Sequence, residues 1–162
     1  MFRLQTLAGA FNGLEQKIRF IKHGYQKALV DPLARRFVEI TAGRGTREEQ
    51  ARAIYNAVRS RLNYLPDPVG VELTKTPSVI LAEMDTRGGS TSGDCDDHAS
   101  LNYSLLQLAG IPAKLRVIWY GPGSNPKHIY AIAFLAGRWV PFDTTRKAGF
   151  ATEAPYRQAM DF

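Results

Sequence analysis

The one cysteine of the chain, Cys95, lies where a glycine-rich segment gives way to a helical pattern. The preceding residues, 86–94, read TRGGSTSGD, which is typical of a loop. A side chain in the first turn of a helix lies near unpaired backbone N–H groups and the positive end of the helix dipole. Both features favour the thiolate, which is the nucleophilic form, and the same N–H groups can stabilise an oxyanion. Cys95 is therefore the candidate nucleophile.

Three acids, Asp94, Asp96 and Asp97, flank this cysteine. A lone cysteine is often only a small buried side chain, but so many acids predict that this turn faces solvent. Their negative charge also opposes ionisation of the thiol. Together with His98 the acids resemble a metal cluster, yet no second cysteine or histidine supports one. We therefore predict no metal ligands here and a simple hydrogen bond for His98.

A cysteine nucleophile needs a base and a group that orients the base. Of the three histidines, His23 lies in a basic helical segment and is expected on the surface, and His98 lies close to the cysteine on the same helix. His128 begins an apolar strand pattern, and Asp143 follows the next strand pattern along the chain. We therefore take His128 and Asp143 as the candidate base and its orienting acid.

The turn between these two strands decides whether His128 and Asp143 meet. If residues 135 and 136 form its centre, His128 lies directly opposite Asp143. If residues 136 and 137 form its centre, Asp143 is the diagonal neighbour of His128. Both registers place the two side chains on one face at the same end of the hairpin. The alternative without a catalytic role is that His128 and Asp143 form an ordinary cross-strand polar pair at the edge of a sheet.

Helical patterns fill the first part of the chain, and strand patterns follow. We expect helices over residues 7–26, from Pro32 after the cap Asp31, from the capping box Thr46–Glu49 to about Tyr64, over 77–84 and over 95–108. We expect a loop over 65–78, within which Thr76 and Pro77 open the short helix, a second loop over 86–94, and strands over 115–119, 128–135 and 139–142. This order predicts an α+β fold with an antiparallel sheet of at least three strands.

Composition is that of an ordinary globular protein: 162 residues, 44% hydrophobic and 22% charged. It argues against a disordered or fibrous chain, and one cysteine excludes an internal disulfide. The longest apolar run, residues 129–136, is far shorter than the roughly 20 residues of a membrane helix. The first residues do not read as a signal peptide, so we predict a cytoplasmic protein that contacts no membrane.

The positive charge is concentrated at the N-terminal end. Residues 1–64 contain 12 Lys and Arg against 5 Asp and Glu, whereas the whole chain has a net charge of +6. The plain interpretation is a set of solvated helix faces. Docking to a larger assembly through these basic helices is left open, and binding to nucleic acid is the less favoured alternative.

Three segments together resemble the transglutaminase-like superfamily. They are GDCDDHASLNYSLLQLAGIPAKLRV (residues 93–117), KHIY (127–130) and GRWVPFDTT (137–145). In each, the candidate residue stands in the local context that the family shows: a cysteine that opens a helix, a histidine that opens a strand, and an aspartate that closes the last strand. The resemblance runs from about Tyr64 to Thr145, half of the chain.

The resemblance implies a papain-like core, a Cys95/His128/Asp143 triad and no cofactor. Members of the superfamily include cross-linking transglutaminases, cysteine proteases and amide hydrolases. We expect a thiol protease or amidase that acts on a protein or peptide substrate. A catalytically silent binding or structural module is the main alternative, and a cross-linking acyltransferase is another.

Three further expectations concern the domain layout, the location of the protein and the second oxyanion donor. We predict one domain over 1–162, with a helical N-terminal extension (1–60) and a catalytic core (64–145). Compact relatives occur in bacteria and phages, so a virion-associated location is an alternative to the cytoplasm. The second oxyanion donor stays open among Trp119, Ser92 and Asn102.

Overall fold

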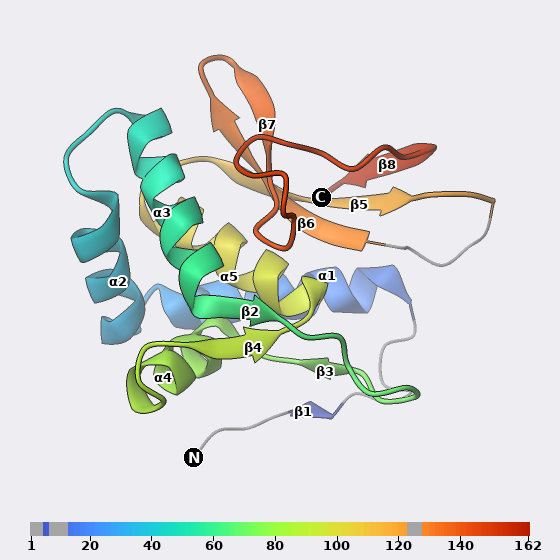
Figure 1. Cartoon of the computed structure of the whole chain (residues 1–162), viewed down its shortest axis with the longest axis horizontal. Helices are drawn as coiled ribbons and strands as arrows, with labels where there is room; N and C mark the ends of the chain where they lie inside the picture. Colours follow the sequence, from blue (N-terminus) through green and yellow to red (C-terminus); the bar gives the residue numbers. More distant parts are fainter. Residues whose placement is uncertain (1–4, 7–12, 123–127) are drawn as a thin grey trace.

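The computed structural model describes residues 5–6, 13–122 and 128–162 (Figure 1). Its helices are α1 (Leu14–Ala28), α2 (Pro32–Ala42), α3 (Arg47–Arg61), α4 (Pro77–Thr86) and α5 (Cys95–Leu108). Its strands are β1 (Gln5–Thr6), β2 (Leu62–Tyr64), β3 (Leu73–Thr74), β4 (Thr91–Gly93), β5 (Ala113–Trp119), β6 (His128–Leu135), β7 (Arg138–Phe142) and β8 (Gln158–Asp161). Helices precede the main sheet, so the predicted α+β class is confirmed.

Local capping determines where most helices begin. The Asp31 side chain accepts a hydrogen bond from the Leu33 N–H at 2.9 Å, and Thr46 and Glu49 form the predicted capping box. These bonds satisfy N–H groups that a helix cannot pair internally. The first helix begins at Leu14, whereas the first residues of the predicted helix, 7–12, lie outside the described part of the chain.

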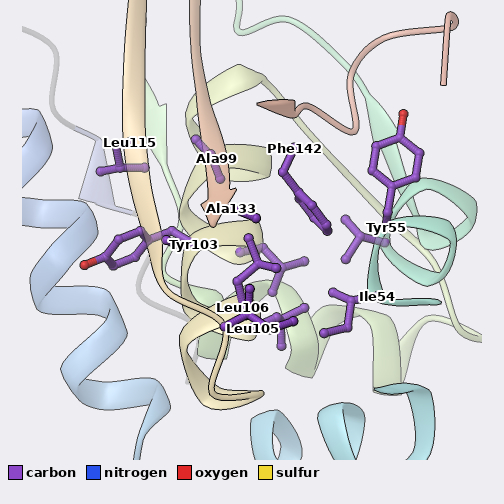
Figure 2. Close-up of a cluster of buried hydrophobic side chains, with 14 of the residues drawn as sticks. Ile54, Tyr55, Ala99, Tyr103, Leu105, Leu106, Leu115, Ala133 and Phe142 are labelled. Carbon is purple, nitrogen blue, oxygen red and sulfur yellow. The ribbon is translucent and has the colours of Figure 1, made fainter. Parts of the chain in front are cut away.

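Helix α5 runs through the middle of the molecule (Figure 1). It contacts the other four helices as well as β4, β5 and β6. Its side chains are buried from Asp96 to Leu106. Figure 2 shows the core that forms where α5 meets the sheet and α3, with Leu105 and Leu106 near Phe142 and Ile54. The site is built around the N-terminal end of this helix.

The main sheet has the strand order β7-β6-β5-β8, with antiparallel pairs throughout. In the β6–β7 hairpin Leu135 pairs with Arg138, which leaves Ala136 and Gly137 as a two-residue turn. Both turn residues have positive φ, 49° and 79°, as the tight hairpin turns matched to sheet twist require. The second of the two predicted registers is therefore observed.

Five short strands, β1, β2, β3, β4 and β8, were missed. Strand β2 lies where the third helix was expected to end, and β4 lies inside the expected 86–94 loop; they pair in parallel, with Leu62 opposite Thr91 and Tyr64 opposite Gly93. Strands β3 and β8 lie in segments without a strand pattern. Such short strands are fixed by long-range pairing and carry no readable periodicity. No helix of the described residues is long and apolar enough to cross a membrane.

The hairpin turn offers a test of register control. An added Cβ at Gly137 would meet no atom within 4 Å, so Gly137→Ala strains the backbone without a clash. We expect a loss of about 1 kcal/mol in unfolding free energy, or about 2–4 °C in thermal midpoint. The matched control is Gly121→Ala, which is equally open but has no positive φ. Equal midpoints for the two variants would contradict the turn as described.

Candidate active site

Cys95 is the first residue of α5, and the turn that presents it is held by its neighbours. The Asp94 carboxylate accepts from the N–H groups of Asp96 and Asp97 at 3.0 and 3.2 Å. Asp97 in turn accepts from the Asp94 N–H at 3.3 Å. Gly93 is required here, because an added Cβ would lie 2.6 Å from the Asp97 side chain. This reciprocal cap fixes the backbone on both sides of Cys95.

The expectation that this turn faces solvent is wrong. Asp96 and Asp97 are each only 2% exposed. Partners from distant segments surround them: the Lys75 N–H donates to Asp97 at 2.7 Å, and the Lys17 ammonium lies 2.5 Å from Asp96. Buried carboxylates are tolerated when they are paired in this way. Burial nevertheless raises the pKa of Asp97 to about 7.

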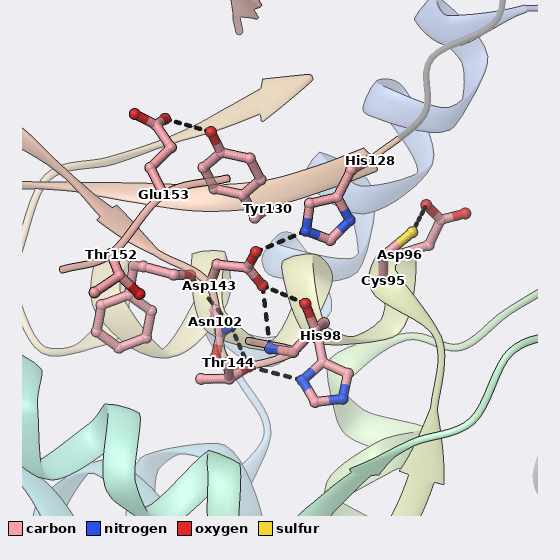
Figure 3. Close-up of polar contacts among 12 residues, drawn as sticks. Cys95, Asp96, His98, Asn102, His128, Tyr130, Asp143, Thr144, Thr152 and Glu153 are labelled. Carbon is pink, nitrogen blue, oxygen red and sulfur yellow. Dashed lines mark hydrogen bonds and ion pairs between the residues drawn. The ribbon is translucent and has the colours of Figure 1, made fainter. Parts of the chain in front are cut away.

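His128 and Asp143 meet at the end of the hairpin (Figure 3). The His128 Nε2 lies 2.6 Å from the Asp143 Oδ2, and the two side chains are 12% and 2% exposed. Thr145 donates to the other carboxylate oxygen through its N–H and its hydroxyl, at 3.1 and 2.7 Å. Burial acts to raise the pKa of Asp143, but the His128 and Thr145 contacts hold it below its ordinary value. Asp143 is thus a buried carboxylate that fixes the imidazole.

A side chain of helix α3 also holds the backbone of Asp143. The Tyr55 hydroxyl on α3 donates to the Asp143 carbonyl at 3.3 Å. The Tyr55 ring stands edge-on to the rings of Phe142 and Phe150, with centroids 5.5 and 5.4 Å away. Aromatic packing therefore fixes the end of β7, and with it the position of the carboxylate.

Cys95 and His128 line one cavity of about 70 Å³. Ile129, the residue after His128, lines the same cavity. Figure 3 shows the His128 ring between Asp143 and Cys95. Because Nε2 is engaged by Asp143, Nδ1 is the nitrogen left for the cysteine. The structure thus brings all three candidate residues together.

The thiol itself is less acidic than its place on the helix alone suggests. Burial is the largest influence that raises the pKa of Cys95, followed by the charges of Asp96 and Asp94. The Ile129 N–H and the Lys17 ammonium act in the opposite direction. The sulfur lies 3.7 Å from Asp96 Oδ1, to which it donates. The resting group is therefore a thiol, and its reaction needs a base.

A second polar cluster, made of His98, Asn102 and Thr144, lies next to Asp143 (Figure 3). The His98 Nδ1 and the Asn102 Nδ2 lie 2.7 and 2.8 Å from the Thr144 hydroxyl. Burial lowers the pKa of His98 to about 4, so the ring is neutral. These bonds fix Thr144, the residue after Asp143, and they engage the Asn102 amide that was one of three open oxyanion donors. In the described part of the chain no group of three or more His, Cys, Asp or Glu side chains could hold a metal ion.

Several residues at the site carried no recognisable sequence signal. Leu14 and Lys17 of α1 line the cavity with Cys95. Tyr64 pairs with Gly93, two residues before Cys95, and Tyr120 follows β5, whose Ile118 pairs with His128. Both tyrosines are about half exposed, and burial raises the pKa of each. All four come from segments distant from residue 95, so only the tertiary fold could reveal them.

A larger groove of about 350 Å³ lies elsewhere, between α2 and α4 and beside the end of α3. Leu33, Phe37 and Ile40 form part of its wall. It contains none of the three candidate residues. We place the candidate active site in the smaller cavity, because Cys95 and His128 both line it.

Chains of known structure are similar to this one. A candidate protease from Parabacteroides distasonis aligns with a TM-score of 0.56 at 16% identity, over 78% of this chain and 26% of that chain. A candidate cysteine protease from Cytophaga hutchinsonii aligns with a TM-score of 0.46 at 18% identity, over 84% of this chain and 41% of that one. A TGase aligns with a TM-score of 0.46 at 16% identity, over 91% of this chain and 36% of that one.

This chain therefore spans less than half the length of each of these proteins. At such identities the likeness concerns the fold alone. No curated protein matches the chain.

A family model of the transglutaminase-like superfamily matches residues 34–144. The match begins well before Tyr64, where the resemblance was expected to start, and so includes α2 and α3. It covers more than half of the chain and contains Cys95, His128 and Asp143. The chain belongs to the transglutaminase-like superfamily.

Proposed function

We propose that the protein is a thiol hydrolase of peptide or amide bonds, with Cys95 as nucleophile, His128 as base and Asp143 as orienting acid. The observation that carries this proposal is the 2.6 Å contact between His128 and Asp143 at the rim of the cavity that holds Cys95. The superfamily and the local contexts of the three residues support it. The activity of the similar chains enters only as analogy.

In the first half of the reaction His128 Nδ1 takes the proton of the Cys95 thiol. The sulfur attacks the carbonyl carbon of the substrate, and the carbonyl oxygen becomes an oxyanion. When the oxyanion collapses, the C–N bond breaks and the amine leaves with the proton from His128. Asp143 stabilises the transient imidazolium, which its low pKa and its contact with Nε2 favour.

The thioester is then hydrolysed. His128 removes a proton from water, the resulting hydroxide attacks the thioester carbon, and the thiolate leaves and recovers its proton from His128.

Asp94 caps the N–H groups of Asp96 and Asp97, so we assign the Cys95 N–H as the first oxyanion donor. Losing such a donor typically costs about 100-fold or more in rate.

Acyl-enzyme formation tests this proposal. With a p-nitrophenyl ester of a blocked amino acid, we expect a burst of one p-nitrophenolate per protein, followed by steady turnover. Intact-mass measurement should place one acyl group on Cys95, the only cysteine. Cys95→Ala should show neither burst nor adduct. Its thermal midpoint should change little, because only one partly buried sulfur is lost.

The same assay separates the alternatives. Water as the acceptor gives the free acid even when a lysine amine is added. Conversion of most acyl-enzyme to the lysine amide would instead identify an acyltransferase. A wild-type protein that gives no burst and no adduct would be a silent module, and the proposed hydrolase would be wrong.

The role of Asp143 has its own test. Asp143→Asn keeps the shape and the Thr145 contacts but removes the charge that stabilises the imidazolium. We expect kcat/KM for the ester to fall by roughly 10³-fold or more, with the fold intact. Asp31→Asn is the matched control, since asparagine caps α2 as well as aspartate does. Wild-type kinetics for Asp143→Asn would remove Asp143 from the mechanism.

A further inference from the structure

Helix α1 lies outside the part of the chain that matches the family, yet it forms a wall of the site. The match begins at residue 34, whereas α1 spans Leu14–Ala28. Leu14 and Lys17 line the cavity that contains Cys95 and His128. The cationic side chain among them, Lys17, is mostly buried, with 19% of its surface exposed. A buried cation next to a nucleophilic sulfur requires an explanation.

Lys17 is held between two carboxylates. Its ammonium lies 2.5 Å from Asp96 Oδ2 and forms a second ion pair with Glu72. The other oxygen of Asp96 lies 3.7 Å from the Cys95 sulfur. Ammonium, carboxylate and thiol therefore form one continuous chain of contacts. Burial acts to lower the pKa of Lys17, but the two carboxylates outweigh it and keep the ammonium charged.

Several other groups surround Cys95, and the two acids among them act to raise the pKa of its thiol. They are Asp94 and Asp96 on its own turn, Lys17 on α1, His128 and the Ile129 N–H on β6, Tyr64 on β2 and Tyr120 after β5. Lys17 is the permanently charged cation of this set. A thiolate that forms beside an unpaired, buried Asp96 would face strong repulsion in a low-dielectric site.

We propose that Lys17 is a positioning residue of the active site: it pairs with Asp96 and offsets the negative charge that Asp96 would otherwise direct at the Cys95 sulfur. This inference rests on the proposed function, since it assigns Lys17 a part in activating the same nucleophile. It makes α1 a component of the site and not only an appendage to it.

The test uses the pH profile of Cys95 alkylation by iodoacetamide in Lys17→Met, which keeps the length and apolar stem of the side chain. Loss of the ammonium should slow alkylation at pH 7 by about tenfold and move the profile to higher pH. Lys17→Arg, which keeps the charge, should restore most of the rate. Lys22→Met, an exposed position on the same helix, is the control and should match wild type.

A double-mutant cycle with Asp96→Asn tests the proposed route. Asp96→Asn alone should speed alkylation, and in its background Lys17→Met should slow alkylation less than it does in the wild-type background. An unchanged profile in Lys17→Met, or equal slowing with and without Asp96, would overturn the proposal. Faster alkylation of Lys17→Met at every pH would also overturn it, because Lys17 would then only cover the sulfur.

Two further measurements distinguish a wrong role for Lys17 from a variant that does not fold and from failure of the proposed function. If Lys17→Met does not fold by circular dichroism, slower alkylation of Asp96→Asn alone still contradicts the proposal. Failure of the proposed function appears elsewhere, as the absence of an acyl-enzyme in the wild-type protein.

Discussion

Burial of helix α5 is the constraint on which the rest of the molecule depends. The helix is covered on all sides, by four helices and by the sheet, so its first turn must place its charges inside the protein. Asp96 is therefore paired with the Lys17 ammonium, and Asp97 accepts a hydrogen bond from the Lys75 backbone N–H. These contacts tie α1 and the β3–α4 segment to the site. The same burial makes the Cys95 thiol weakly acidic. Reactivity then depends on groups supplied by other elements.

The β6–β7 hairpin supplies the proposed base. Its two-residue turn fixes the register, and the register brings His128 to Asp143 as a diagonal pair. Tyr55 and the aromatic rings around it hold the Asp143 backbone, and Thr145 holds its carboxylate. The imidazole is thus fixed from the sheet side, while the cysteine is fixed from the helix side. The proposed reaction takes place where these two parts meet.

Local signals in the sequence predicted much of this arrangement. The caps at Asp31 and Thr46, the start of α5 at Cys95 and the alternation along β5 act over a few residues, so each could be recognised without the fold. The pairing of β2 with β4 could not, because three-residue strands carry no periodicity. The burial of Asp96 was also unpredictable, since its partner Lys17 lies on another helix far away in the chain.

The central claim is that His128 acts on the Cys95 sulfur, and the most direct measurement is the alkylation rate of Cys95 in wild type and His128→Ala from pH 5 to 10. A general base typically contributes roughly 10²-fold or more. Wild type should therefore react about 100-fold faster near pH 7, and the two rates should converge at high pH, where the thiol ionises unaided. Equal rates across the whole range would contradict the account and leave Cys95 without a base.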